Sequence, residues 1–184
     1  MNLNPLAVIR PKLFINANAR KPRKSGTLAT HLYPENICLD VAVSSKLELF
    51  DVIGRHMERE HALPGEWVVR SLSRREQTAS TGLGKGVAIP HARVKDLDRM
   101  HAAYLRLKSP IPFDAPDGNP VVDILVLLAP SQADEAHLGI LADATHLFSD
   151  RRFRVRLHRC NHAQAVKHLF DSWSQPAAAS FSNV

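Results

Sequence analysis

The sequence is poor in cysteine and contains no long hydrophobic run. Its two cysteines, Cys38 and Cys160, are too few for the disulfide framework that stabilises small secreted domains. The longest apolar run, Ile124–Ala129, is far shorter than the roughly 20 residues that cross a bilayer. The first 30 residues lack the apolar stretch and the small-residue cleavage site of a secretory signal. These absences exclude a disulfide scaffold and membrane insertion, and they predict a cytoplasmic protein.

Acidic residues are missing from residues 1–34, which carry six basic side chains: Arg10, Lys12, Arg20, Lys21, Arg23 and Lys24. The whole chain has 24 Lys and Arg against 18 Asp and Glu, so residues 35–184 hold 18 of each sign. Residues 1–34 show neither a helical nor a strand period, and we predict that they form a disordered basic arm. Residues 174–184 are small and polar and are predicted to be a flexible tail. Residues 35–173 are therefore predicted to fold as a single domain.

The basic arm raises the possibility of a nucleic-acid-binding module. Proteins that bind single strands interleave aromatic side chains with basic ones, so that bases stack on the rings. Here Phe14 is the sole aromatic residue among the six basic ones, and the domain that follows is electrically neutral. We therefore do not expect nucleic acid to be the partner.

The spacing of apolar residues predicts alternating helices and strands. Ser45 and Glu48 match a capping box ahead of a helix to about His61. Pro64 is suited to the start of a short helix with Trp67, Val68 and Leu72 on one apolar face. A long helix follows from a cap pattern at Ser131 and Asp134, and Asn161 is a candidate cap for a last helix that ends at Trp173. Strands are predicted at Ile37–Val43, Val87–Ile89, Ala103–Leu107 and Val121–Leu128. The alternation favours an α/β layered domain.

The glycine cluster Gly82-Leu83-Gly84-Lys85-Gly86 does not fit a nucleotide-binding loop. A dinucleotide loop needs G-x-G-x-x-G after a strand, whereas the preceding residues 71–80 look helical and polar. A P-loop needs Ser or Thr after the lysine, and Gly86 stands there. The cluster therefore predicts a mobile or tightly turned backbone, and no nucleotide cofactor.

The histidines offer half of a metal site at most. His158, Cys160 and His162 lie close together, but a structural zinc site usually has four ligands and no second cluster is nearby in the sequence. We therefore predict no metal. Most of the ten histidines, including His31, His56 and His168, are interpreted as surface residues.

His91 differs from these because of what precedes it. Val87-Ala88-Ile89 is followed by Pro90, which cannot donate a hydrogen bond within a sheet and favours extended geometry at Ile89. The strand should therefore stop abruptly, and His91 should lie at the mouth of the sheet, where α/β folds keep reactive groups. From these residues alone, His91 is either a functional residue or a surface histidine.

The sequence around His91 resembles the active-site signature of a known family. That family is the enzyme IIA component, fructose–mannitol and nitrogen-regulatory class, of the bacterial phosphoenolpyruvate-dependent phosphotransferase system. The resemblance covers roughly residues 35–172, and its Phe-Asp-Ala turn looks most like the nitrogen-regulatory branch. Departures occur at Ala79 and Ala92, where members often carry glycine. The matching residues are Ser80 to His91, Arg75-Glu76, Pro112 to Ala115, Pro120-Val121 and His137-Leu138.

The resemblance implies a mixed sheet covered by helices, and phosphoryl transfer from a histidine of a small phosphocarrier protein to His91. It places Arg75 and His137 beside His91. Arg75 has forked cationic donors that suit phosphoryl oxygens, and His137 can donate a further hydrogen bond. Ser80, Thr81, Gly82, Gly84 and Gly86 are predicted to form the loop of the phosphoryl site. Backbone N–H groups of its Gly82–Gly86 part are further candidate donors to the phosphoryl oxygens. No cofactor is implied.

A neutral imidazole needs no general base to attack phosphorus, and its other nitrogen should donate its proton to a carbonyl or carboxylate. The sequence does not show which group that is.

The sequence also leaves two roles open within the class. The chain is either a regulatory phosphocarrier with a downstream target, or a sugar-transport component that donates to a permease-associated IIB domain.

Overall fold

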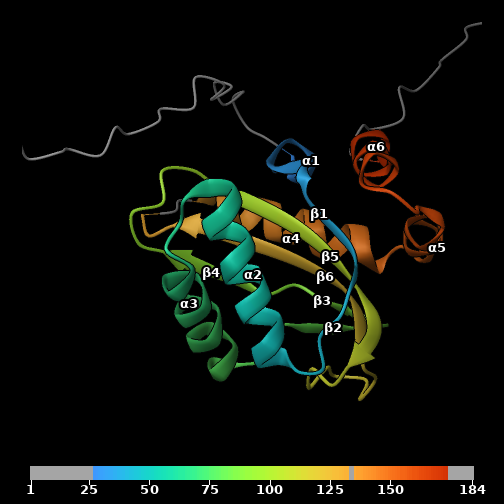
Figure 1. Cartoon of the computed structure of the whole chain (residues 1–184). Helices are drawn as coiled ribbons and strands as arrows, with labels where there is room; N and C mark the ends of the chain where they lie inside the picture. The colour runs from blue at the N-terminus through green and yellow to red at the C-terminus, as the bar shows by residue number, and fades with distance from the viewer. Residues whose placement is uncertain (1–26, 133–134, 174–184) are drawn as a thin grey trace, which may run out of the picture.

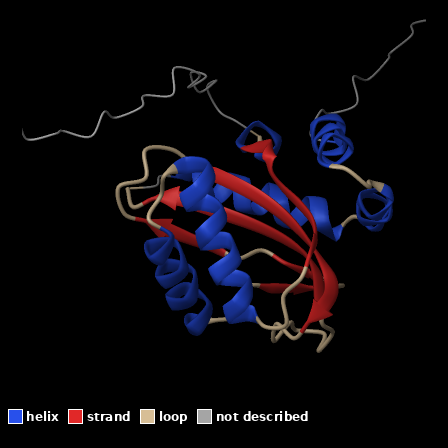
Figure 2. Ribbon diagram, viewed as in Figure 1, coloured by secondary structure: helices blue, strands red, loops and turns tan. Residues whose placement is uncertain are grey.

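The computed structural model describes residues 27–132 and 135–173 (Figure 1). These residues form a six-stranded sheet with helices on both faces (Figure 2). The helices are α1 (Leu28–His31), α2 (Lys46–His61), α3 (Gly65–Thr78), α4 (Glu135–Ser149), α5 (Arg151–Arg159) and α6 (Ala163–Trp173). The strands are β1 (Leu32–Val41), β2 (Gly82–Gly84), β3 (Val87–Ala88), β4 (His91–Val94), β5 (His101–Ile111) and β6 (Val121–Pro130). In the described chain, no helix is both long and apolar enough to cross a membrane.

Strand β6 is the centre of the sheet. The strand order is β1-β5-β6-β3-β2, and β4 also pairs with β6. Strands β5 and β6 are antiparallel, whereas β3 and β4 both run parallel to β6. Both sides of β6 are covered, so nearly every residue of it is buried and its sequence is a continuous apolar run apart from Asp123. The predicted mixed sheet with a central strand at Val121–Leu128 is confirmed.

Strands β3 and β4 follow one line along β6 and are interrupted by two residues. Val87 lies opposite Asp123, and His91 lies opposite Leu127. The two residues of each pair have the same separation in sequence, so the register of the pairing with β6 is the same before and after the interruption. At the interruption the Ile89 N–H donates to the Thr81 carbonyl at 2.9 Å, outside the ladder. The sheet therefore resumes after Pro90, and His91 begins a new strand instead of following the end of one as the sequence suggested.

Two apolar cores lie on the two faces of the sheet. Helices α2 and α3 bury Phe50, Met57 and Leu72 against one face. On the other face, α1, α4, α5 and α6 bury aromatic residues that include Phe148, Phe153 and Phe170 (Figure 2). The edge-to-face contact of Phe153 and Phe170, with centroids 5.2 Å apart, joins α5 to α6.

Helices α2 and α3 occur where the sequence predicted them, with two differences. The Ser45 hydroxyl accepts the Glu48 N–H at 3.2 Å, but Glu48 turns to the Ser44 N–H and hydroxyl instead of completing a reciprocal capping box. Trp67 does not belong to the apolar face of α3: it is 36% exposed, while Val68 and Leu72 are buried.

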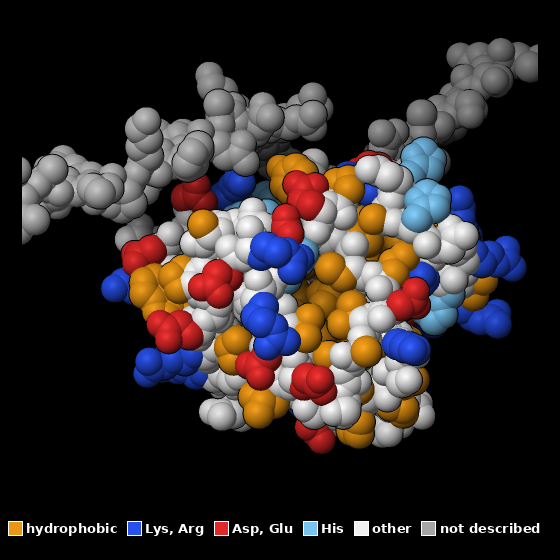
Figure 3. Space-filling view, viewed as in Figure 1, with side chains coloured by type: hydrophobic (Ala, Val, Ile, Leu, Met, Phe, Trp, Pro, Cys, Tyr) orange, Lys and Arg blue, Asp and Glu red, His pale blue; other side chains and the backbone are white. Residues whose placement is uncertain are grey.

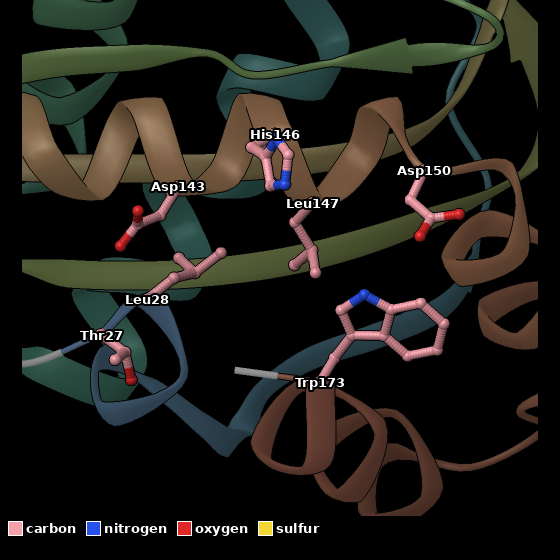
Figure 4. A pocket seen from close by; sticks show the side chains of 7 residues that line it. All are labelled: Thr27, Leu28, Asp143, His146, Leu147, Asp150 and Trp173. Carbon is pink, nitrogen blue, oxygen red and sulfur yellow. The ribbon is translucent and has the colours of Figure 1, made fainter. Parts of the chain in front are cut away.

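The fold begins earlier than the sequence indicated. Residues 28–34, which the prediction assigned to the disordered arm, form α1 and the first part of β1. Leu28 and Leu32 are 2% and 0% exposed. Leu28 also lines a pocket of about 270 Å³ between α1, α4 and α6, together with Thr27, Asp143, His146, Leu147, Asp150 and Trp173 (Figure 4). These residues are part of the folded domain because their side chains complete the core beneath α6.

The C-terminal helices also differ from expectation. A separate helix, α5, follows α4 after the single residue Asp150, whose carboxylate caps it by accepting the Arg152 N–H at 2.8 Å. The cap of α6 is His162, not Asn161, since the His162 Nδ1 accepts the Ala165 N–H at 3.2 Å. Of the cap pattern predicted at Ser131 and Asp134, Asp134 lies outside the described residues, and the Ser131 hydroxyl donates to the Val94 carbonyl.

His56 is a buried residue and not the surface histidine that the sequence suggested. Its Nε2 and the Nε2 of His61 both donate to the Asn36 side-chain oxygen, at 3.2 and 2.8 Å. Asn36 is itself buried and donates to the Ala102 carbonyl. The cluster joins β1, α2 and β5, and it packs the His61 ring against the buried His101 ring with centroids 4.4 Å apart.

Candidate functional site

The backbone around Pro90 fixes the position of His91. Pro90 has no N–H, and its carbonyl accepts the Leu127 N–H from β6 at 3.0 Å. The His91 backbone is thereby held at the start of β4, and its half-buried side chain lies where α3 packs beside this strand. The abrupt interruption of the strand, predicted from Pro90, is what allows the ring to turn back over the chain.

The two ring nitrogens of His91 have different partners. Nδ1 lies 2.8 Å from the Ile89 carbonyl oxygen, which can only accept, so Nδ1 carries the proton. The lone pair is then on Nε2, and there the Arg75 Nε–H donates at 3.1 Å. The Ile89 carbonyl therefore selects the tautomer in which Nε2 is the nucleophilic atom. It is the group that the sequence left unnamed.

Arg75 reaches His91 from the last turn of α3. Besides its contact with His91, it donates from Nη1 to the carbonyl of Ala79 at 2.9 Å, just beyond the end of the helix. Its guanidinium is thereby held against the imidazole, and no carboxylate among the described side chains pairs with it. The structure brings together Arg75 and His91 as the sequence resemblance implied.

The environment of His91 favours the neutral ring. Burial lowers its pKa, the hydrogen bond to Ile89 raises it, and the positive charge of Arg75 lowers it again. The net direction is downward from the ordinary value, so at neutral pH the ring is uncharged and Nε2 keeps its lone pair. An uncharged imidazole beside a fixed cation can attack an electrophilic centre that carries negative charge.

Polar groups of the loop that follows α3 are held by α3 and by the Pro112–Pro120 turn. The Ser80 hydroxyl donates to the Phe113 carbonyl at 2.7 Å and accepts the Gly82 N–H at 3.1 Å. The Thr81 N–H and hydroxyl both donate to Glu76, the latter at 2.5 Å. The Lys85 N–H donates to the Asp117 carboxylate at 2.7 Å. These groups shape the loop, and phosphoryl binding by the backbone of Gly84 or Gly86 stays a prediction.

Glycine is required at two of the loop positions. A Cβ on Gly82 would come within 2.8 Å of the Ala115 Cα, too close for any other residue. Gly84 has a φ of 85°, a backbone conformation that side chains with a Cβ rarely adopt. The glycines that failed as a nucleotide motif therefore make a tight β2–β3 hairpin against the Pro112–Pro120 turn.

Glu76 and Lys46 support the site, although only Glu76 had a signal in the sequence. The Lys46 Nζ donates to Glu76 at 2.8 Å, to Asp114 at 2.9 Å and to the Phe113 carbonyl at 3.2 Å. It also lies 4.4 Å from the centre of the Phe113 ring. Glu76 stands next to Arg75 in the resemblance. Nothing in the sequence around Lys46 points to this site thirty residues away.

Two other sequence predictions concern His137 and metal binding. His137 belongs to the first turn of α4, but its side chain lies outside the described part of the structure, so its proximity to His91 stays a prediction. Within the described residues, no group of three or more His, Cys, Asp or Glu side chains could hold a metal ion. His158 belongs to the cluster with Cys160 and His162 that resembled half of a metal site in the sequence. Its Nε2 pairs with the buried Asp123 carboxylate at 2.6 Å.

Comparison with known proteins identifies the family. Residues 30–173 match the family described as "Phosphoenolpyruvate-dependent sugar phosphotransferase system, EIIA 2". The nitrogen regulatory protein homolog of Haemophilus influenzae is 33% identical over 148 residues, which cover 78% of this chain and 90% of the relative.

Solved structures agree in fold. The crystal structure of nitrogen regulatory protein IIA-Ntr from Neisseria meningitidis has a TM-score of 0.74 and 38% identity, covering 78% of this chain and 98% of that one. Mannitol enzyme IIA of Escherichia coli, solved in complex with phosphorylated mannitol enzyme IIB, has a TM-score of 0.63 and 19% identity, with 75% and 95% covered. It shares the fold. The chain belongs to the EIIA type 2 family of the phosphoenolpyruvate-dependent sugar phosphotransferase system, which supports a phosphocarrier-type role.

Proposed function

We propose that this chain is a regulatory phosphocarrier that accepts a phosphoryl group on the Nε2 atom of His91 from the histidine of a small phosphocarrier protein. The observation that carries the proposal is the division of roles at His91. The Ile89 carbonyl holds the proton on Nδ1, and Arg75 places a cation beside the free lone pair of Nε2.

The transfer needs no further base. The Nε2 lone pair forms a bond to phosphorus while the phosphorus–nitrogen bond to the donor's histidine breaks and its electron pair returns to the donor ring. The Nδ1 proton stays on His91, so the ring becomes cationic, and its hydrogen bond to Ile89 then becomes a stronger, charge-assisted one. The phosphoryl group carries its negative charge on the equatorial oxygens throughout.

Arg75 must change partners during the reaction. Its Nε–H now points at the lone pair that attacks, so the guanidinium has to shift from nitrogen to the incoming phosphoryl oxygens. An arginine suits this shift because its planar fork can donate to two oxygens at once. His137 would donate to the same oxygens from α4, as the family resemblance implies.

The nitrogen-regulatory branch is favoured over sugar transport. The relative from Haemophilus influenzae and the structure from Neisseria meningitidis, at 33% and 38% identity, both bear nitrogen regulatory names. The mannitol protein, at 19% identity, contributes the fold alone. Donation to a IIB domain remains the alternative, and a downstream regulatory target is the partner that the favoured branch requires.

The test is to incubate the full chain with phosphoenolpyruvate, the general phosphotransferase enzyme and its phosphocarrier, and then to measure its intact mass. We expect one added phosphoryl group that is labile in acid. His91→Ala should abolish the addition while the thermal transition stays unchanged, because His91 lies at the edge of the core. His168→Ala, at an exposed histidine, is the matched control. Full labelling of the His91→Ala chain would refute the proposal.

A further inference from the structure

Helix α5 is strongly basic. Its nine residues, RRFRVRLHR, contain five arginines and one histidine but no acidic residue. Residues 35–184 hold 18 basic and 18 acidic side chains, so the rest of this region carries an excess of negative charge once α5 is set aside. The neutral balance that argued against an anionic partner therefore conceals a local concentration of positive charge.

The charges surround an exposed apolar side chain. Phe153 and Leu157 are fully buried under α5, which places Val155 on the opposite, solvent face, where it is 41% exposed. Residues three and four positions away are its neighbours on the helix surface. All four of these neighbours are basic: Arg151, Arg152, His158 and Arg159.

Some arginine side chains of α5 have partners within the chain, and others do not. Arg152 pairs with Asp150 at 2.9 Å, and Arg154 donates to the Phe148 carbonyl at 2.5 Å. Arg156 stacks over the Trp173 ring at 5.4 Å. The side chains of Arg151 and Arg159 are exposed and make no hydrogen bond or ion pair with the described residues. Arg151 is also in the first turn, where the helix dipole disfavours a cation.

The surface lies away from His91. Helix α5 packs on the core that contains α4 and α6, whereas α3, which carries Arg75, packs on the other core. In Figure 1 the two helices are at opposite margins, and Figure 3 shows basic and histidine side chains gathered at the margin where α5 lies. A partner on α5 would leave access to His91 open.

We propose that the solvent face of α5, formed by Arg151, Arg152, Val155 and Arg159, docks an acidic protein segment with an apolar side chain among its carboxylates; His158 is turned towards the buried Asp123 carboxylate and is not part of this face. The two unpaired arginines bind carboxylates through paired N–H groups. Val155 meets the apolar side chain and loses its exposure to water. Arginine around a desolvated apolar centre is the usual composition of an energetically important interface patch.

The limited extent of the charge favours a protein over nucleic acid. A duplex is negative along its whole length, and its affinity comes from many phosphate contacts over a broad surface. Here the positive surface is one helix long, and Asp150 caps its beginning. The remainder of the domain would repel a long polyanion, whereas a short acidic segment meets α5 alone. An exposed valine at the centre also has nothing to gain from phosphates.

The proposal is tested by fluorescence anisotropy with the full chain. The probe is a labelled helical peptide in which one leucine is flanked by glutamates three and four residues before and after it. We expect saturable binding that the double change Arg151→Glu/Arg159→Glu weakens by about tenfold or more. Val155→Ser, and replacement of the peptide's leucine by serine, should each weaken it several-fold.

The matched control is Arg55→Glu/Arg70→Glu, which makes the same change of charge at exposed positions of α2 and α3. It should bind the peptide like the original chain, and circular dichroism should show all variants folded. Three outcomes would overturn the proposal. The first is no binding at millimolar peptide, and the second is an equal loss in the control. The third is tighter binding of a DNA duplex that depends on Arg151 and Arg159 but not on Val155.

Discussion

At the scale of single residues, the chemistry of His91 depends on one carbonyl and one cation. The Ile89 carbonyl oxygen determines that Nδ1 carries the proton. Arg75 donates to Nε2, and its positive charge opposes protonation of that second nitrogen. Their effects on the charge of the ring are opposite, because the hydrogen bond to Ile89 raises the pKa of His91 and the charge of Arg75 lowers it, but together with burial they leave a neutral ring with its lone pair on Nε2. The hydrogen bond from Arg75 has to be given up when phosphorus arrives, so its contribution should appear in the rate.

Replacing Arg75 should slow phosphoryl acceptance without preventing it. We expect Arg75→Ala to lower the rate by about tenfold to a few hundredfold, the size typical for one donor to developing charge. Arg75→Lys should recover part of the rate, since it restores the charge but not the fork. The measurement is the initial rate of phosphorylation by the phosphocarrier, with the neighbouring exposed Arg74→Ala as control.

A second readout separates this role from a purely structural one. The positive charge of Arg75 lowers the pKa of His91, so in Arg75→Ala the NMR titration of the His91 ring should move to higher pH. An unchanged rate together with an unchanged titration would show that Arg75 serves only to end α3.

Buried histidines should make the fold sensitive to acid. Burial lowers the pKa of His101 to about 4, and the nearby His61, Arg99 and His31 act in the same direction while Asp98 opposes them. In the unfolded chain the pKa is near 6.5, so below that pH the unfolded state binds a proton that the folded state does not. Stability is therefore complete above pH 6.5 and decreases towards pH 4, by about 3 kcal/mol from this group.

The measurement is the free energy of unfolding in urea from pH 7.5 to pH 4.5, for the original chain and for His101→Phe. The variant retains a ring that can pack against His61 but cannot titrate. We expect its unfolding free energy to fall less steeply with acid, whatever its value at neutral pH. Parallel curves for the two proteins would mean that His101 does not supply the pH dependence.

At the scale of elements, the sequence predicted best where one local signal sufficed. The apolar run of β6 and the Ser45 cap of α2 need no distant partner, and both were predicted at about their observed positions. Pro90 similarly marked the interruption at which His91 lies. The sequence could not show that the sheet resumes at His91, because that depends on pairing with Leu127 in a strand thirty-six residues later.

The elements that were missed depend on long-range contacts or on concealed patterns. His56 is buried because Asn36, twenty residues away, accepts its hydrogen bond. Glu76 orders the loop at Thr81 because Lys46, thirty residues away, holds its carboxylate. In α5 the arginines obscure the two apolar residues, Phe153 and Leu157, that dock the helix. The site itself was identified through the family resemblance, since residue spacing alone does not bring Arg75 to His91.

At the scale of the whole molecule, the sheet separates two cores with different tasks. The α2–α3 side carries Arg75 and the loop that surrounds His91. The α4–α6 side holds the larger aromatic cluster and is completed by residues from the beginning of the described chain, Leu28, Ala29 and Leu32. The Lys167 Nζ on α6 also donates to the Ala29 carbonyl at 3.1 Å. The second core therefore depends on a segment that the sequence assigned to the disordered arm.

A chain that begins at Pro34 should consequently be much less stable than one that begins at Thr27. The shorter chain loses α1 and the first residues of β1, including two leucines that are almost completely buried. Each buried leucine contributes about 1.5–3 kcal/mol, so the loss is a large share of the roughly 5–15 kcal/mol by which a domain is stable.

The chain that begins at Thr27 keeps all of these contacts and should unfold in urea like the full-length protein. Phosphoryl acceptance by the Thr27 chain should also be unchanged, because Arg75, which contacts His91, lies on α3 and this helix packs on the other core. Equal unfolding midpoints for the Pro34 and Thr27 chains would show that the α4–α6 core closes without α1.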